Sequence, residues 1–267
     1  MQIEVLYFDH LVDKQKSSEE LFQPLMHVSH DDLTRLFQSA LYVPVIDEDS
    51  LVRGILTGQA AVFYREEEVY LADVSGMEMR NITPSETESV IVGPHDAFIE
   101  SAETNLSLIR RRLRSNRLKV IRLEIGEVTK TPFFLLYLDG IANPDLVRSM
   151  IERIQRMEVD SVYDTHMLTQ HIDDTALSLF PQFLTTERPE GAVSKLMEGR
   201  LIGILDHSPA VICAPTTIFE FFTSPDDYYQ RWMVGTATRL LRYLAFIITT
   251  SLTALYVSLT SHHYEMI

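Results

Sequence analysis

The chain has very little cysteine, since Cys213 is the only one in its 267 residues. A lone thiol excludes an internal disulfide framework and fits a reducing compartment. The first residues also lack the unbroken apolar run of a secretory signal, because Asp9, Asp13 and Lys14 interrupt it. These absences indicate a protein that keeps its N-terminal part in a reducing compartment.

Positive charge is scarce in the first hundred residues, which hold six Lys and Arg against nineteen Asp and Glu, a balance of −13. The other residues hold seventeen basic and nineteen acidic side chains, a balance of −2. Nucleic-acid binding depends on Lys and Arg that neutralise phosphates. The acidic front half therefore argues against nucleic acid as a partner.

The familiar motifs of catalysis are missing as well. No G-x-S-x-G, Walker loop or G-x-G-x-x-G occurs, so we predict no catalytic residue, no cofactor and no enzyme. Two histidine pairs, His27 with His30 and His166 with His171, have neither an H-E-x-x-H spacing nor a set of cysteines near them. No metal site is predicted from these pairs.

One long apolar run is present near the C-terminus. Residues 243–261 carry no charge, and as a helix these nineteen residues would span roughly 28 Å, close to the hydrocarbon core of a bilayer. Arg231, Arg239 and Arg242 precede the run, and flanks rich in Arg tend to stay cytoplasmic. We predict a transmembrane helix over 240–261, with everything before it cytoplasmic. The alternatives are a core helix of a soluble protein and an interfacial helix, which the lack of charge on the polar side disfavours.

Hydroxyl groups follow one side of this predicted helix. Seven of the nineteen uncharged residues are Thr or Ser. At 100° per residue, Thr249, Thr253, Tyr256 and Thr260 fall on one stripe. A hydroxyl stripe gains nothing from lipid, but it can bond to a neighbouring helix or line a pore. These four residues are therefore predicted to face a helix bundle or a pore.

Two pairs of passages resemble each other within the chain. "VLYFDHLVD" (5–13) matches "LLYLDGIAN" (135–143), and each reads as a buried strand ending in Asp, then a turn and a helix. "LTGQAAVFYREEEVYLADV" (56–74) matches "MEGRLIGILDHSPAVICAP" (197–215), each with a Gly before two apolar strands around a polar turn, as in a β-hairpin. The chain is predicted to hold two related modules, unless the likeness is chance similarity between generic strand–helix units.

Alternating strands and helices predict an α/β fold: two related α/β subdomains of mixed sheets with helices, followed by one transmembrane helix. We expect helices at 17–24, 30–40, 101–115, 144–157, 165–174 and 189–198. We expect strands at 3–9, 59–64, 68–73, 118–125, 132–138, 182–186, 200–205 and 210–214. The first cytoplasmic subdomain should cover 1–92 and the second 93–230, with the Gly-Pro of "VGPHDAF" (92–98) marking the linker.

Asp9 and Asp139 follow the two matching strands, where α/β folds often place a group that binds a ligand or metal. The plainer interpretation is turn chemistry, in which each Asp accepts hydrogen bonds from backbone amides and starts the next helix. No second carboxylate recurs beside both residues, so the turn interpretation is favoured.

Five arginines crowd into "IRRRLRSNR" (109–117). They suit a solvated helix face, a contact with anionic lipid headgroups, or a pairing with the acidic first module of a neighbouring copy. As a candidate interaction surface the residues are Arg110, Arg111, Arg112, Arg114 and Arg117.

Four passages, in order, resemble the GerA family of bacterial spore germination proteins, the A subunits of nutrient germinant receptors. They are "GPHDAFIESAETNLSLIRRRLRS" (93–115), "TKTPFFLLYLDGIAN" (129–143), "PQFLTTERPEGAVSKLMEGRLIGILDHSPAVICAP" (181–215) and "SPDDYYQRW" (224–232). The resemblance covers the chain from about residue 90 to its end, and "TERP" and "SPDDYY" are its most specific parts.

The resemblance implies two cytoplasmic α/β subdomains and a membrane domain of several spans in the spore inner membrane. It also implies B and C subunits as partners, a homo-oligomer, and a nutrient-triggered release of ions through a ligand-gated channel. "SPDDYYQRW" would couple the modules to the span, with Asp226 and Asp227 capping a helix. No nutrient-binding residue is carried over.

The chain departs from the family pattern in two places. It ends after one span where members have several, so we expect a fragment of a longer protein. The turn Asp206-His207-Ser208-Pro209 replaces the usual Asp-Gly-Ser/Thr-Pro, which puts the turn type in question. Two alternatives stay open: an A-type paralogue that assists channel opening, and a membrane-tethered cytosolic α/β ligand-binding or enzymatic module.

Overall fold

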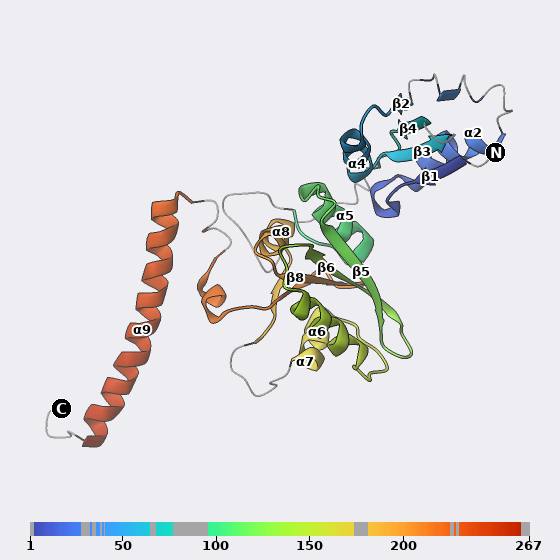
Figure 1. The fold of residues 1–267 in the computed structure, drawn as a ribbon. Helices are drawn as coiled ribbons and strands as arrows, with labels where there is room; N and C mark the ends of the chain where they lie inside the picture. The colour runs from blue at the N-terminus through green and yellow to red at the C-terminus, as the bar shows by residue number, and fades with distance from the viewer. Residues whose placement is uncertain are drawn as a thin grey trace.

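The computed structural model shows two sheet units followed by one long helix (Figure 1). The α/β class with a long apolar helix at the end is confirmed. We predicted mixed sheets, but all strand pairs among the described residues are antiparallel. The structure describes residues 3–27, 33, 36, 37, 39, 41–64, 68–76, 96–173, 181–224, 227 and 230–262.

The first unit is a four-stranded sheet in the order β1-β3-β4-β2. Its strands are β1 (Ile3–Leu6), β2 (Tyr42–Pro44), β3 (Ala60–Tyr64) and β4 (Glu68–Ala72). One face packs against α4 (Glu48–Leu56), and the other against a helical stretch whose Leu21 is fully buried. That stretch contains η1 (Asp9–Leu11), α1 (Lys14–Lys16), the π-helical η2 (Ser17–Phe22) and α2 (Gln23–His27).

The second unit is a five-stranded sheet in the order β5-β6-β8-β9-β7, with helices on both faces (Figure 1). Its strands are β5 (Leu118–Ile125), β6 (Thr131–Leu138), β7 (Leu184–Thr186), β8 (Leu201–Leu205) and β9 (Val211–Ala214). Successive side chains of a strand point to opposite faces. Leu136 accordingly joins the core under α5 (Ala102–Arg112) and α8 (Pro189–Met197), whereas Leu135 joins the core under α6 (Pro144–Gln155) and α7 (Thr165–Ile172).

The two sheets share one topology. The order β1-β3-β4-β2 repeats as β6-β8-β9-β7, and β5 is an addition beside β6. In the first unit, α4 connects the edge strand β2 to β3, and β4 lies between these two strands. In the second unit, α8 connects β7 to β8 in the same way, with β9 between them. The matched passages of the sequence therefore occupy equivalent places in the two sheets. The subdomain boundary near residue 92 lies outside the described residues.

The connecting helices also end in the same way. Gly58 and Gly199 follow α4 and α8 with φ of 94° and 85°, a left-handed conformation that glycine adopts without strain. The amide after each glycine donates to the carbonyl five residues earlier, from Gln59 to Gly54 and from Arg200 to Lys195. This hydrogen bond is typical of a Schellman motif, in which a glycine ends the helix and turns the chain into the next strand.

Helix capping falls four residues beyond the aspartates expected for it. Asp13 accepts hydrogen bonds from the amides of Gln15 and Lys16, at 2.8 Å and 3.0 Å, and Asn143 accepts one from Asp145 at 2.9 Å. These caps are the last residues of the matching passages 5–13 and 135–143. Asp9 instead forms an exposed ion pair with Lys14, and the carbonyl of Asp139 accepts a hydrogen bond from Arg117.

Several predicted elements need correction. The strand β2 and the helix α4 were not predicted, and the first predicted helix, 17–24, is largely the π-helical η2. Most of the predicted helix 30–40 lies outside the described residues. Both elements give weak signals in the sequence. β2 has only three residues, one of which is Pro44, and α4 has Gly54 near its end.

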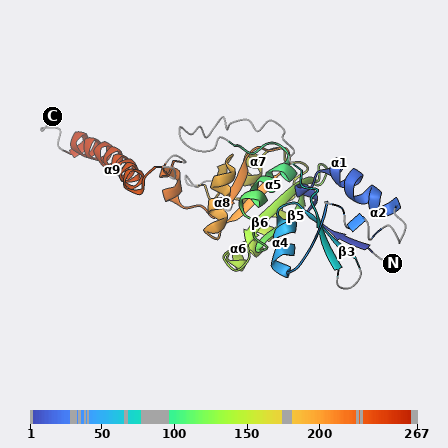
Figure 2. The ribbon, with the colours of Figure 1, turned by 90° about the horizontal axis from the view of Figure 1, so that it is seen from above.

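The last element among the described residues is α9 (Trp232–His262), which projects away from both sheet units (Figures 1 and 2). Its 31 residues correspond to roughly 46 Å of helix. By length and composition it could cross a membrane, and none of its apolar window is buried against the rest of the chain. A core helix would be buried, so the structure does not support that alternative. The helix begins eight residues before the predicted 240.

Candidate functional site

Buried charge gathers where the second sheet unit meets α9. Glu220 lies on the short 3-10 helix η3 (Ile218–Phe222), and its side chain is 8% exposed. Its carboxylate pairs with Lys195 of α8 at 3.4 Å and with Arg200, which precedes β8. The hydroxyls of Thr216 and Thr217 each donate to it at 3.1 Å. These ion pairs connect η3 to the C-terminal end of α8.

The environment of Glu220 keeps it ionised. Burial by itself would raise the pKa of this carboxyl, but the hydrogen bond from Arg200 and the charges of Lys195 and Arg200 outweigh burial and lower the pKa. A buried carboxylate of this kind is held in place by its partners, because loss of one partner would leave a charge without compensation.

A second carboxylate, that of Asp227, binds two arginines in the first three turns of α9. The side chain of Asp227 is fully buried and receives two hydrogen bonds from Arg242, at 2.6 Å and 3.0 Å, and one from Arg239 at 3.3 Å. It also accepts the amide of Ser224 at 3.0 Å. Burial would raise the pKa of Asp227, yet the hydrogen bonds and charge of Arg242 lower it overall.

Asp227 therefore differs from its predicted role. The sequence suggested that Asp226 and Asp227 cap a helix, but Asp227 forms ion pairs with Arg239 and Arg242, which lie four residues and one residue before the uncharged run begins at Tyr243. Asp226 lies outside the described residues. The two-pronged geometry of the Arg242 contact is the arrangement in which guanidinium and carboxylate bind most specifically.

Aromatic rings complete the junction between η3 and α9. Phe222 lies 5.5 Å from Tyr243 and 5.0 Å from Phe246, measured between ring centroids, and Phe219 lies 5.9 Å from Tyr243. Arg242 donates to the carbonyl of Phe222 at 3.0 Å. The result is a continuous path of contacts from α8 through Glu220 and η3 to α9, which suits the transmission of a displacement.

The five arginines of the predicted interaction surface do not share one face. Arg110 is buried, with its guanidinium 4.2 Å from the ring centre of Phe8 in the first unit. Arg111 donates to the carbonyl of Gly76 at 2.5 Å, also in the first unit. Arg112 pairs with Asp96 at 2.7 Å and Glu190 at 2.9 Å.

These contacts lie within one chain, and successive helical residues point about 100° apart, which explains why the cluster divides. Only Arg114 and Arg117 are exposed, and both also donate to backbone carbonyls. The first unit therefore contacts α5 of its own chain, an arrangement that differs from all three sequence-based interpretations of the cluster, which were a solvated face, a lipid contact and a neighbouring copy. A contact between a neighbour and the two exposed arginines stays a prediction.

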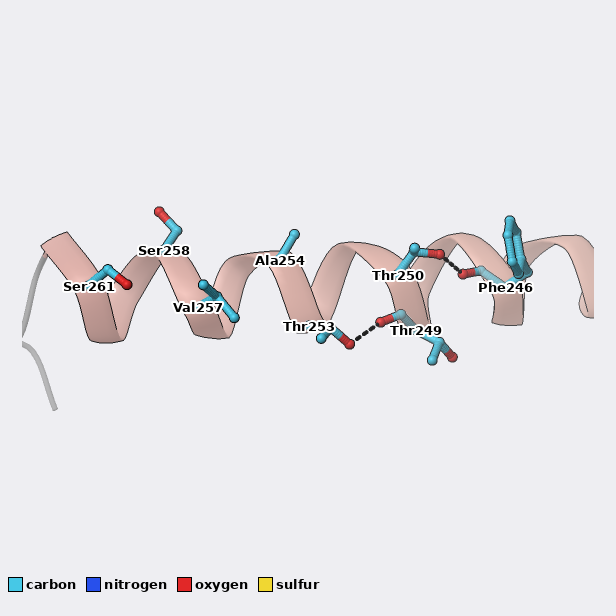
Figure 3. A pocket seen from close by; sticks show the side chains of 8 residues that line it. All are labelled: Phe246, Thr249, Thr250, Thr253, Ala254, Val257, Ser258 and Ser261. Atoms are coloured by element: carbon cyan, nitrogen blue, oxygen red, sulfur yellow. Dashed lines mark hydrogen bonds between the residues drawn. The ribbon is translucent and has the colours of Figure 1, made fainter. Parts of the chain in front are cut away.

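Hydroxyl groups on α9 bond within the helix itself. Thr249 donates to the carbonyl of Ala245 at 2.8 Å, Thr253 to that of Thr249 at 2.8 Å, and Thr260 to that of Tyr256 at 2.9 Å. One open face of the helix is lined by Thr, Ser and Ala side chains together with Phe246 and Val257 (Figure 3). Thr249 and Thr253 of the predicted stripe belong to this face. Internal bonding satisfies their hydrogens without a partner helix, so a bundle or pore role stays a prediction.

The other candidates from the sequence remain apart. His166 and His171 are exposed on α7, while His30 and the side chain of His27 lie outside the described residues. Within the part of the chain that the structure describes, no group of three or more His, Cys, Asp or Glu could hold a metal ion. Glu220 gave no signal in the sequence, because its partners are twenty and twenty-five residues away along the chain.

Comparisons with known proteins cover the whole of this arrangement. A family model described as "Bacillus/Clostridium GerA spore germination protein" matches residues 1–267. The chain is similar to spore germination protein GerQA of Bacillus cereus, with 35% identity over 99% of this chain and 54% of the relative. It is also similar to spore germination protein KA of Bacillus subtilis (strain 168), with 32% identity over 100% of this chain and 51% of the relative.

A solved structure has the same fold. It is the crystal structure of the N-terminal domain of the A subunit of the Bacillus megaterium spore germinant receptor GerK3, with a TM-score of 0.58 and 24% identity. The match covers 81% of this chain and 83% of that one. The chain spans about half the length of the curated relatives it matches.

Proposed function

The chain belongs to the GerA family of spore germination proteins, and from that premise we propose that it is part of the A subunit of a spore germinant receptor. In this role it takes part in nutrient-triggered germination and in the release of ions from the spore. The carrying observation is the family match, which extends over both sheet units, the η3 junction and α9 alike.

The proposed location is the spore inner membrane, with α9 as a span and the preceding residues in the cytoplasm. Arg231, Arg239 and Arg242 support this orientation, because they precede the uncharged residues 243–261. We propose subdomains at 1–92 and 93–230, which the repeated sheet topology supports. The proposed partners are the B and C subunits and further copies of the chain, and no enzymatic activity is part of the proposal.

The junction gives this role a mechanism. Opening of a receptor requires an element with two arrangements that a ligand can bias. The path from α8 through Glu220, η3 and Asp227 connects the second sheet unit to α9 by ion pairs and ring contacts. A rearrangement on the cytoplasmic side would therefore reach the span, and the reverse also holds.

The test uses spores in which the full-length gene that contains this chain is the sole source of its A subunit. We expect deletion to abolish germination and ion release in response to the cognate nutrient. D227N should slow both at a normal protein level, because it removes the charge that Arg242 and Arg239 meet. D145N is the matched control, since Asp145 pairs with Arg148 on an exposed surface. Spores that respond to every nutrient without the gene would overturn the proposal.

A further inference from the structure

Large apolar side chains lie exposed on η3, beside α9. Ile218, Phe219 and Phe221 are 38%, 63% and 43% exposed. Three such groups within five residues form an apolar patch, and exposed patches of this kind mark contacts with a protein or a membrane. They are continuous with the apolar surface of α9, because Phe219 and Phe222 both pack against Tyr243.

The contacts of η3 fix its depth along α9. Tyr243 is the first residue of the uncharged run, and Phe246 lies roughly 4.5 Å further along the helix. The ring of Phe222 packs against both side chains. If residues 243–261 occupy the hydrocarbon core, η3 lies at the boundary between headgroups and hydrocarbon.

The charge of this region allows a lipid surface close by. Glu220 is the only charged residue of η3, and it is buried among Lys195 and Arg200. Residues 216–243 hold three acidic and three basic side chains, a balance of zero in a chain of net charge −15. The junction is therefore not repelled by anionic lipid, which would repel the acidic front half.

We propose that η3 makes a second contact with the membrane, in which Ile218, Phe219 and Phe221 insert at the boundary between headgroups and hydrocarbon. Aromatic side chains favour this zone of a bilayer. The inference rests on the proposed function in one respect, that α9 spans the bilayer. It adds that η3 holds the second sheet unit against the membrane surface.

The test measures quenching of tryptophan emission by lipid. The 267-residue chain is reconstituted in phosphatidylcholine and phosphatidylglycerol vesicles, with or without bromine on the upper acyl chain. Trp232 is the only tryptophan, so W232F provides a silent background. Single tryptophans are then introduced by F221W in η3, by L252W inside the uncharged run, and by I46W as a control. Ile46 is 96% exposed and lies between β2 and α4. Figure 1 shows both of these elements away from α9.

We expect brominated lipid to reduce the emission of the F221W and L252W variants and to leave that of the I46W variant unchanged. Loss of emission for L252W alone would overturn the η3 contact and leave the span intact. Unchanged emission for both would overturn the span, and the proposed function would lose its membrane anchor. If the F221W variant resists both brominated lipid and aqueous acrylamide, another protein surface covers η3, and the lipid contact is wrong.

Discussion

His207 occupies a backbone conformation that favours glycine. Its φ is 69°, in the left-handed region, and its amide donates to the carbonyl of Glu100 at 2.8 Å. A side chain with a Cβ costs about 1–2 kcal/mol in this region. This residue stands where the family resemblance led us to expect Gly, and the observed φ shows why glycine would suit the position.

We predict that H207G raises the free energy of unfolding by roughly 0.5 kcal/mol. Relief of the left-handed conformation should exceed the greater freedom that glycine gives the unfolded chain. H207V should lower the free energy by about 1–2 kcal/mol, because a β-branched side chain tolerates positive φ worst. Urea unfolding of the chain in detergent measures both changes, and equal stabilities of the three proteins would contradict the argument.

Single residues also mark the limit of prediction from the sequence. The sequence predicted that Asp9 and Asp139 start the next helices. The N-caps are instead Asp13 and Asn143, because the turn after each strand is longer than the pattern suggested. Glu220 and Asp227 were beyond reach as ion-pair partners, since burial and pairing depend on contacts between distant segments. Local patterns report which side chains can cap, and only the fold reports which of them do.

At the scale of elements, α9 combines an apolar surface with hydroxyls that bond internally. We predict that T249V, T253V and T260V together leave the helix content of the chain unchanged, since each lost bond joins a side chain to its own helix. Circular dichroism in detergent provides the check.

The same triple variant tests the proposed bundle or pore role of the stripe. If Thr249, Thr253 and Thr260 face other helices, assembly or ion release should weaken in spores that carry the variant. S251A is the control, because Ser251 lies about 200° around the helix from Thr249 and is not among the residues of the open face. Normal assembly and ion release in the triple variant would show that the stripe faces lipid.

The hairpins were the best-predicted elements. Each has a glycine before a buried run, and β3 pairs with β4 as β8 pairs with β9. The division of the arginine cluster was not foreseen, because the helix directs Arg110, Arg111 and Arg112 to three different partners. The spacing of apolar residues predicts which side chains of an element are buried. It does not predict which residues of the second unit contact the first unit, as Arg110 and Arg111 do.

On the scale of the whole molecule, the two sheet units meet at a half-buried histidine, His10, on η1 beside Arg110 of α5. Burial and the charge of Arg110 lower the pKa of His10 to about 4, while Asp9 acts in the opposite direction. The Nε2 atom of His10 is buried without a hydrogen-bond partner among the described residues, as a neutral ring permits. The folded chain therefore binds a proton here only at about pH 4, whereas the unfolded chain does so near its ordinary pKa of 6.5.

We predict that this histidine stabilises the chain fully above about pH 6.5 and that stability falls as the pH drops from there to about 4. The unfolded state binds more protons in this window, and the loss should reach roughly 2 kcal/mol. Urea unfolding at pH 7.5 and pH 4.5 measures it. H10Q should reduce the pH dependence, whereas H171Q, on an exposed part of α7, should keep it. An unchanged pH dependence in H10Q would show that His10 is not responsible.

The length of α9 has a mechanical consequence. Its ion pair at Arg242 lies roughly 15 Å from the Trp232 end and roughly 30 Å from the other, so the helix is a lever with unequal arms and a fulcrum at Asp227. If the helix stays straight, a displacement of the short arm by about 1 Å becomes about 2 Å at the far tip, in the opposite direction. Such a lever would enlarge a small displacement of the two sheet units and reverse its direction at the far end of α9.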